Sequence, residues 1–149
     1  MARKPNKRQR ENARIREQRA QRTRLFADPK AVRRPLAGYG EAYEITRSGN
    51  LWSRRLSRYI KPAYDPHTGR PYVNFKSNGE RVTLSTWRAV IESWFSEEER
   101  AALRQIVPDD ALGHIERLRQ HRQAIGAAAR MHRIPDTILF NFLLAGRAD

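Results

Sequence analysis

Arginine is the residue type in this sequence with the clearest capacity for chemistry. A guanidinium group presents a planar fork of N–H donors, which matches the oxygens of a phosphate and the edge of a guanine base. One group of basic residues surrounds a short segment of alternating apolar residues, and it consists of Arg47, Arg54, Arg55, Arg58 and Lys61. This group predicts contacts to a nucleic-acid backbone. A solvated basic surface is the alternative.

A second concentration of positive charge lies at the N-terminus, where residues 1–34 contain 13 Lys and Arg and 3 acidic residues. Apart from Met1, Ile15 is the one large apolar residue among residues 1–24, so this segment cannot bury a core. Like charges oppose the helix that residues 13–25 favour by propensity, so we expect disorder or a frayed helix that becomes ordered on a polyanion. A tail that only aids solubility is the alternative. The expected phosphate contacts of this arm are Arg8, Arg10, Arg14, Arg16, Arg19, Arg22, Arg24, Arg33 and Arg34.

The whole chain of 149 residues has a formal net charge of +14, which favours a polyanionic partner. Nucleic acid is the first candidate and an anionic membrane surface the second. No run of about 18 apolar residues is present, so we expect no membrane-spanning helix. The N-terminus lacks the apolar stretch of a secretory signal and the regular apolar spacing of a mitochondrial presequence. We therefore expect a cytoplasmic protein of a host or phage-infected cell, associated with the nucleoid if bacterial.

Candidate catalytic residues are few. The chain has no cysteine, which excludes disulfides, cysteine zinc sites and thiol nucleophiles. Asp110 and His114 are four residues apart and would share one face of a helix, close enough to hold a divalent metal ion together. A surface helix with a chance His explains the same pair. We therefore expect no catalytic residue, no metal and no cofactor, and a diverged Mg²⁺-dependent nicking enzyme is the alternative.

These residues must be positioned by a small α+β fold. Residues 28–42 contain two prolines and two glycines and predict a linker. Two β-hairpins follow, turning at residues 48–50 and at Asn78-Gly79, because alternating apolar residues flank each turn. An amphipathic helix is then predicted to pack on the strands, through Trp87, Val90, Ile91, Trp94 and Phe95.

Residues 96–149 predict a helical region, so the expected parts are 1–34, 35–95 and 96–149. Ser96 and Glu99 have the spacing of a capping box. Two short helices then flank a break at residues 132–135, which is similar to a helix-turn-helix, and the second would expose Thr137 and Asn141 to a major groove. Asn141 could read adenine. A plain helical hairpin that closes the core is the alternative. The other contacts expected here are Arg130, Arg133 and Arg147.

An ordered set of short segments carries a family resemblance: YEITRSGNLWS, then IKP, then TGRPYVNFKSNGER, then TWRAVIESWF. Together they resemble the DNA-binding region that precedes the nuclease core in HNH homing endonucleases, which are common in phages. The matching positions are Tyr43, Glu44, Ile45, Gly49, Leu51, Ser53, Lys61, Pro62, Val73, Gly79, Arg88 and Val90.

The sequence departs from that family in two ways. Trp87 replaces a family histidine, and nothing after Phe95 matches the block that supplies the family's metal ligands and general base. The resemblance therefore implies a non-catalytic protein that binds nucleic acid, duplex DNA rather than RNA. A nicking endonuclease, and an RNA-binding or virion component held by its Arg-rich tail, are the alternatives.

Overall fold

The computed structural model describes residues 3–26 and 31–146, with side chains described for 3–16 and 31–146. Contacts divide the chain into two units, Met1–Ala31 and Val32–Asp149. The first unit contains one helix, α1 (Lys7–Phe26), in its described part. Its start is fixed by a reciprocal cap, in which the Gln9 N–H donates to Asn6 Oδ1 at 2.8 Å and the Asn6 N–H donates to Gln9 Oε1 at 3.0 Å. This cap explains why the helix begins before residue 13, where propensity alone placed it.

The strands of the second unit form two antiparallel sheets. The first sheet has the order β1-β2-β3-β4 and comprises β1 (Arg33–Pro35), β2 (Tyr43–Thr46), β3 (Leu51–Ser53) and β4 (Arg58–Tyr59). The second has the order β5-β6-β7 and comprises β5 (Ala63–Tyr64), β6 (Pro71–Ser77) and β7 (Glu80–Ser85). Both predicted hairpins are confirmed. The second turns through Asn78 and Gly79 at φ values of 52° and 80°, as this tight turn requires.

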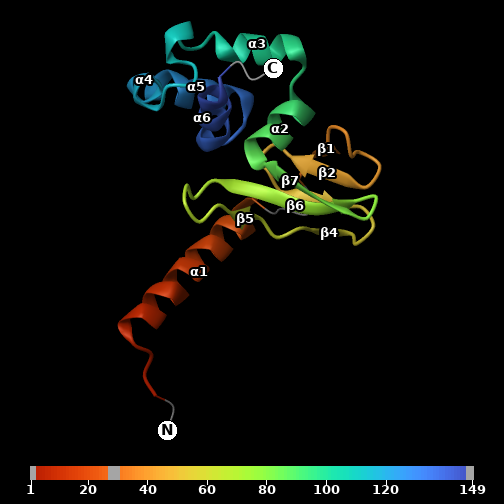
Figure 1. Ribbon diagram of the computed structural model, residues 1–149, viewed down its shortest axis with the longest axis vertical. Coiled ribbons are helices and arrows are strands. Elements are labelled where there is room, and N and C mark those ends of the chain that lie inside the picture. Colours follow the sequence, from red (N-terminus) through yellow and green to blue (C-terminus); the bar gives the residue numbers. More distant parts are fainter. Residues whose placement is uncertain (1–2, 27–30, 147–149) are drawn as a thin grey trace. The chain divides into compact units, whose positions relative to one another are not determined.

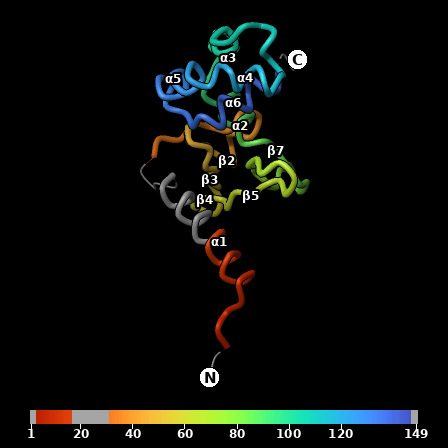
Figure 2. Tube along the Cα trace, turned by 90° about the vertical axis from the view of Figure 1, so that its left-hand side faces the viewer, coloured from red at the N-terminus to blue at the C-terminus, as the bar shows by residue number. Residues whose placement is uncertain are grey.

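The helices follow the strands in the chain. They are α2 (Thr86–Trp94), α3 (Glu97–Arg104), α4 (Ile115–Gln120), α5 (Arg122–His132) and α6 (Asp136–Ala145), with a 3₁₀ turn η1 (Asp109–Ala111) before α4. Figures 1 and 2 both show α2 between the strands on one side and α3 to α6 on the other. The predicted capping box is present, with Ser96 Oγ accepting from the Glu99 N–H and Glu99 Oε1 accepting from the Ser96 N–H.

The core is continuous from the sheets to the C-terminal helices. Val90 and Ile91 of α2 are fully buried, together with Ile45 and Leu51 of the first sheet and Leu139 of α6. The α+β class, the two hairpins, the packing helix and the helical C-terminal region are therefore as the sequence predicts. Residues 35–95 and 96–149, which the sequence separates, share this core.

The segment predicted as a linker contains the strand β1, although its prolines and glycines are typical of a loop. β1 pairs with β2, with Arg34 opposite Ile45 and Pro35 opposite Glu44. Leu36 directly after it is 1% exposed. Arg33 and Arg34, which the sequence assigns to the N-terminal arm, thus belong to a strand of the folded unit.

Candidate nucleic-acid interface

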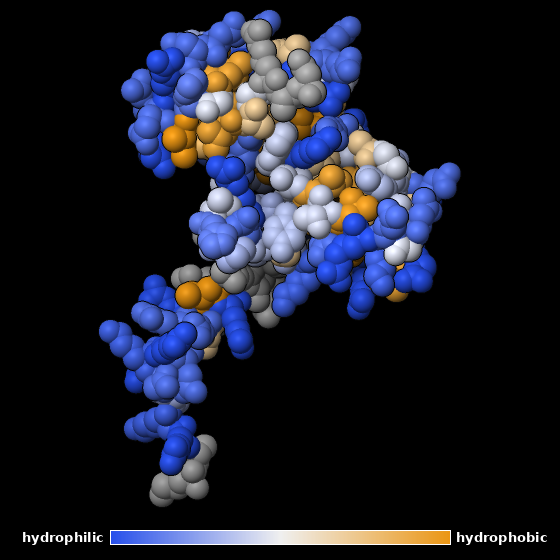
Figure 3. Space-filling view, viewed as in Figure 1, coloured by the Kyte–Doolittle hydropathy of each residue, from blue (hydrophilic) through white to orange (hydrophobic). Residues whose placement is uncertain are grey.

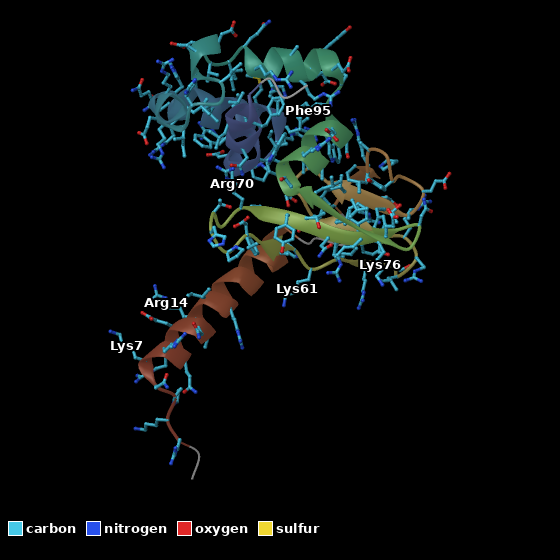
Figure 4. All side chains as sticks on the ribbon, in the orientation of Figure 1. Lys7, Arg14, Lys61, Arg70, Lys76 and Phe95 are labelled. Atoms are coloured by element: carbon cyan, nitrogen blue, oxygen red, sulfur yellow. The ribbon has the colours of Figure 1, made fainter. Side chains whose placement is uncertain are left out.

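The arm presents its charge on α1. The described arginine side chains of this helix, Arg8, Arg10, Arg14 and Arg16, are all exposed. Figure 4 shows Lys7 and Arg14 projecting away from the helix axis. Arg19, Arg22 and Arg24 lie on the same helix, but their side chains are outside the described residues. Arg147 also lies outside them.

Arg34 and Arg47 have a structural task that the sequence does not reveal. Both lie over the indole of Trp94, with Cζ at 4.6 Å and 4.7 Å from its centroid. Arg34 Nη1 donates to the Trp94 carbonyl at 3.2 Å, and Arg47 Nη1 donates to the His132 carbonyl. These carbonyls belong to the last residues of α2 and α5, where helices have no internal donors left. Each guanidinium therefore caps the negative end of a helix to which it does not belong.

The surroundings of Arg47 are strongly positive. Partial burial, and then the charges of Arg34 and Arg133, lower the pKa of Arg47, and among the described residues the charge of Glu99 opposes this. Arg133 directly follows His132 and adopts a left-handed backbone conformation at φ 57°. The guanidinium groups of Arg34 and Arg47 thus share the Trp94 ring, and the charge of Arg133, the residue after the one whose carbonyl Arg47 caps, acts on Arg47 as well.

Arg33 and Arg54 share one carboxylate, that of Glu44. Arg33 Nε lies 3.6 Å from Glu44 Oε2, and Arg54 Nε lies 3.6 Å from Glu44 Oε1. Arg33 also stacks on Trp52, with Cζ 4.0 Å from the ring centroid, and its side chain is only 20% exposed. The Arg54 side chain is 54% exposed. Arg33 is therefore held within the first sheet, whereas Arg54 remains open to a ligand.

The remaining basic residues near the first hairpin face solvent. Arg55, Arg58 and Lys61 are exposed, and none of their side chains makes a hydrogen bond or an ion pair within the described part of the chain. The sequence grouped them with Arg47 because all lie close together in the chain. The structure separates this group into a helix cap at Arg47 and free cations at residues 55, 58 and 61.

The outer face of the second sheet is a basic surface that the sequence analysis missed. On β6 and β7, Val73, Phe75 and their partners face the core, so the alternate residues face outward. The outer pairs are Tyr72 opposite Ser85, Asn74 opposite Thr83 and Lys76 opposite Arg81. These six residues, named here the outer β6–β7 face, include no acid. The period-two alternation of residues 72–85 was the signal that could have found them.

This face continues onto a two-stranded ribbon. β5 pairs only with Pro71 and Tyr72, so β6 and β7 extend beyond it as a hairpin that carries Lys76 and Arg81. Tyr43 supports the ribbon from the inner side, because its ring packs 4.6 Å from Phe75 and its hydroxyl donates to the Lys76 carbonyl at 2.8 Å. Figure 4 shows Lys61 and Lys76 on the side of the strands away from α2.

The α5–α6 pair has the turn of the predicted helix-turn-helix, but α6 has a different environment. This helix packs against α2, α4 and α5. Thr137 on α6 and Arg130 on α5 are exposed, whereas Asn141 on α6 is half-buried. On the face shown in Figure 3, hydrophobic colour gathers over the C-terminal helices, which carry the exposed Met131 and Ile115. This arrangement favours the alternative, a helical pair that closes the core.

The expectation that Asp110 and His114 share a helix face is wrong. Asp110 lies in η1, His114 precedes α4, and Gly113 between them has a φ of 79° that interrupts the helix. Asp110 instead lies 3.4 Å from Arg117. Within residues 3–16 and 31–146, no group of three His, Asp or Glu side chains could hold a metal ion.

No family model, curated protein or solved structure matches this chain. Among the described residues, no helix is both long and apolar enough to cross a membrane.

Proposed function

We propose that this protein binds duplex DNA without cutting it, and that it docks the outer β6–β7 face in the major groove. The observation that carries the proposal is the composition of this face, which has two cations, polar side chains and no acid on an exposed ribbon. The resemblance to the DNA-binding region of HNH homing endonucleases covers the same residues and supports the same conclusion.

The dimensions of the ribbon suit this partner. Paired strands lie about 4.8 Å apart, and a B-DNA major groove about 12 Å wide admits a two-stranded ribbon. Beyond β5 the hairpin is two strands wide, so no third strand obstructs its approach. Lys76 and Arg81 would contact phosphates or guanine, and Asn74 would lie where an amide can read adenine.

The arm supplies affinity rather than sequence choice. The described part of α1 exposes arginines on a helix without a core, and each phosphate that it neutralises adds to salt-dependent binding. Arg55, Arg58 and Lys61 would add contacts from the folded unit.

Anisotropy titrations of labelled duplex DNA over a series of salt concentrations test the proposal. Lys76→Gln combined with Arg81→Gln removes two cations from the ribbon, so the slope of log K against log salt should fall by about 1.8, at about 0.9 per contact. The charge-matched control is Arg117→Gln with Arg119→Gln on α4, which should keep the wild-type slope. Absent binding at low salt, or equal slopes for ribbon variant and wild type, would refute the proposal.

RNA is the partner to exclude in the same experiment. The major groove of A-form RNA is deep and narrow, so a β-ribbon cannot read it. An RNA duplex of matching sequence should therefore compete poorly against DNA for binding. If RNA competes equally and the ribbon variant binds as the wild type does, the arm alone holds nucleic acid, and the RNA-binding alternative replaces the proposal.

A further inference from the structure

The gathering of Arg34, Arg47 and Arg133 is not explained by helix capping alone. Capping engages one N–H of Arg34 and one of Arg47 in the described contacts. A guanidinium carries five such donors. Within the described residues, Arg133 is exposed and makes no side-chain hydrogen bond or ion pair. Most of the donors in this group therefore remain available to a further ligand.

The charge of the group is also not balanced. Among the described side chains, Glu99 is the carboxylate that raises the pKa of Arg47, and its own oxygen accepts the Ser96 N–H of the capping box. No ion pair within 4.0 Å joins it to Arg34, Arg47 or Arg133 among the described residues. Three guanidinium groups and one acid leave a net positive site, and an anion would relieve their mutual repulsion.

The positions of the Arg34 and Arg47 side chains are fixed before any ligand arrives. Trp94, only 5% exposed, supports Arg34 and Arg47 through its ring and is itself held by its Nε1, which donates to the Ile45 carbonyl at 3.1 Å. Stacking and hydrogen bonding thus restrict two long side chains that would otherwise lose rotamer freedom on binding. A preorganised fork of this kind suits the tetrahedral oxygens of a phosphate.

We infer that Arg34, Arg47 and Arg133 form a binding site for a backbone phosphate of nucleic acid, where β1 and β2 meet the α5–α6 turn. The inference rests on the proposed function and adds to it a contact separate in the chain from the outer β6–β7 face. Arg34 and Arg47 hold both the phosphate and the helix ends, and Arg133 holds the phosphate alone.

Arg133 is the residue to vary, because replacing Arg34 or Arg47 also removes a helix cap. Arg133→Gln replaces the charged guanidinium with a shorter, neutral polar side chain and should lower the duplex-DNA salt slope by about 0.9. Arg122→Gln is the matched control, since this exposed arginine lies at the other end of α5. It should keep the wild-type slope, and Arg133→Lys should restore most of it.

Arg133→Gly separates binding from folding. Glycine tolerates the φ of 57° at this position better than arginine, so the variant should melt at the wild-type temperature or above. Its salt slope should nevertheless fall as in Arg133→Gln. Equal slopes for Arg133→Gln and Arg122→Gln would overturn the phosphate site. An unchanged slope in the ribbon variant would instead overturn the proposed docking face, so the two failures are distinguishable.

Discussion

Individual arginines in this chain have different roles although they lie close together in the sequence. Arg47 stacks on Trp94 and caps α5 through the His132 carbonyl. Arg55 is exposed and its side chain makes no hydrogen bond or ion pair within the described residues. The type of residue predicts the capacity for contact, and its surroundings decide which contact is made.

This difference predicts opposite outcomes for two alanine variants. Arg47→Ala removes a charge-assisted hydrogen bond and a cation–π contact, so the free energy of unfolding should fall by about 2 kcal/mol. Arg55→Ala should change it by less than about 0.5 kcal/mol, as expected of an exposed residue. Urea denaturation followed by circular dichroism measures both. Equal effects would show that Arg47 does not cap α5.

Two glycines with positive φ provide a second comparison. A Cβ on Gly49, at φ 96°, would lie 2.5 Å from Thr86 Cγ2, whereas a Cβ on Gly69, at φ 70°, would meet no atom within 4 Å. Gly69→Ala should cost about 1 kcal/mol of unfolding free energy from backbone strain alone. Gly49→Ala should cost at least about 2 kcal/mol, because Thr86 must also move. Thermal melts of the two variants check this order, and a smaller loss for Gly49→Ala would contradict it.

At the scale of single elements, α3 carries a titratable cap. Hydrogen bonds from the Ser96 backbone and side chain lower the pKa of Glu99 from its ordinary value of about 4.5. A carboxylate with a lowered folded-state pKa stabilises the fold above its unfolded value, and that stability is lost as pH falls through the folded value. The loss therefore begins near pH 4.5 and continues below it.

Glu99→Gln tests this origin of the pH dependence. Glutamine can form the same capping box but cannot titrate. The variant should fold at neutral pH and lose less stability than the wild type as pH falls below about 4.5. Urea denaturation over a pH series measures the difference. The same acid sensitivity in both proteins would place its source elsewhere.

Elements with local signals were predictable from the sequence. The Asn78-Gly79 turn, the Ser96–Glu99 box and the apolar face of α2 each depend on residues within a few positions of one another. β1 escaped prediction, because a three-residue strand containing Pro35 has no pattern of its own and exists only by pairing with β2. Asp110 and His114 were misplaced because the positive φ of Gly113 was not anticipated.

The candidate site was less predictable than the fold. The exposed arginines of α1 follow from composition, but the capping role of Arg47 depends on a carbonyl 85 residues away in the chain. No local spacing encodes such a contact. The outer β6–β7 face was predictable, because the alternation of apolar and polar residues along a strand is a local signal. The denser arginine clusters elsewhere in the sequence gave the stronger signal.

At the scale of the whole molecule, the two units predict separable contributions to binding. Residues 1–31 contain 11 Lys and Arg and 3 acidic residues, and residues 32–149 contain 19 and 13. Residues 32–149 alone should melt at the temperature of the full chain, since the core lies within them. Their DNA affinity should be lower and their salt slope smaller than those of the full chain. Anisotropy titrations of both proteins measure these differences.

The truncation has two informative failures. Equal salt slopes for the full chain and residues 32–149 would show that α1 makes no phosphate contacts. Complete loss of binding without the arm would show that the outer β6–β7 face does not dock on its own account. Circular dichroism of residues 1–31 with and without DNA adds a check, because helix content should rise when a polyanion screens its like charges.

The cap donated by Arg47 also determines where this chain can be divided. A protein cut after Phe95 would lose α6 from the face of α2, and the Arg47 guanidinium would lose the carbonyl that it caps. The helices on the other side would lose a cap at the end of α5. The strands and the C-terminal helices therefore depend on each other for folding. Recombination that joined either part to an unrelated sequence at residue 95 would leave that part without the contacts that stabilise it.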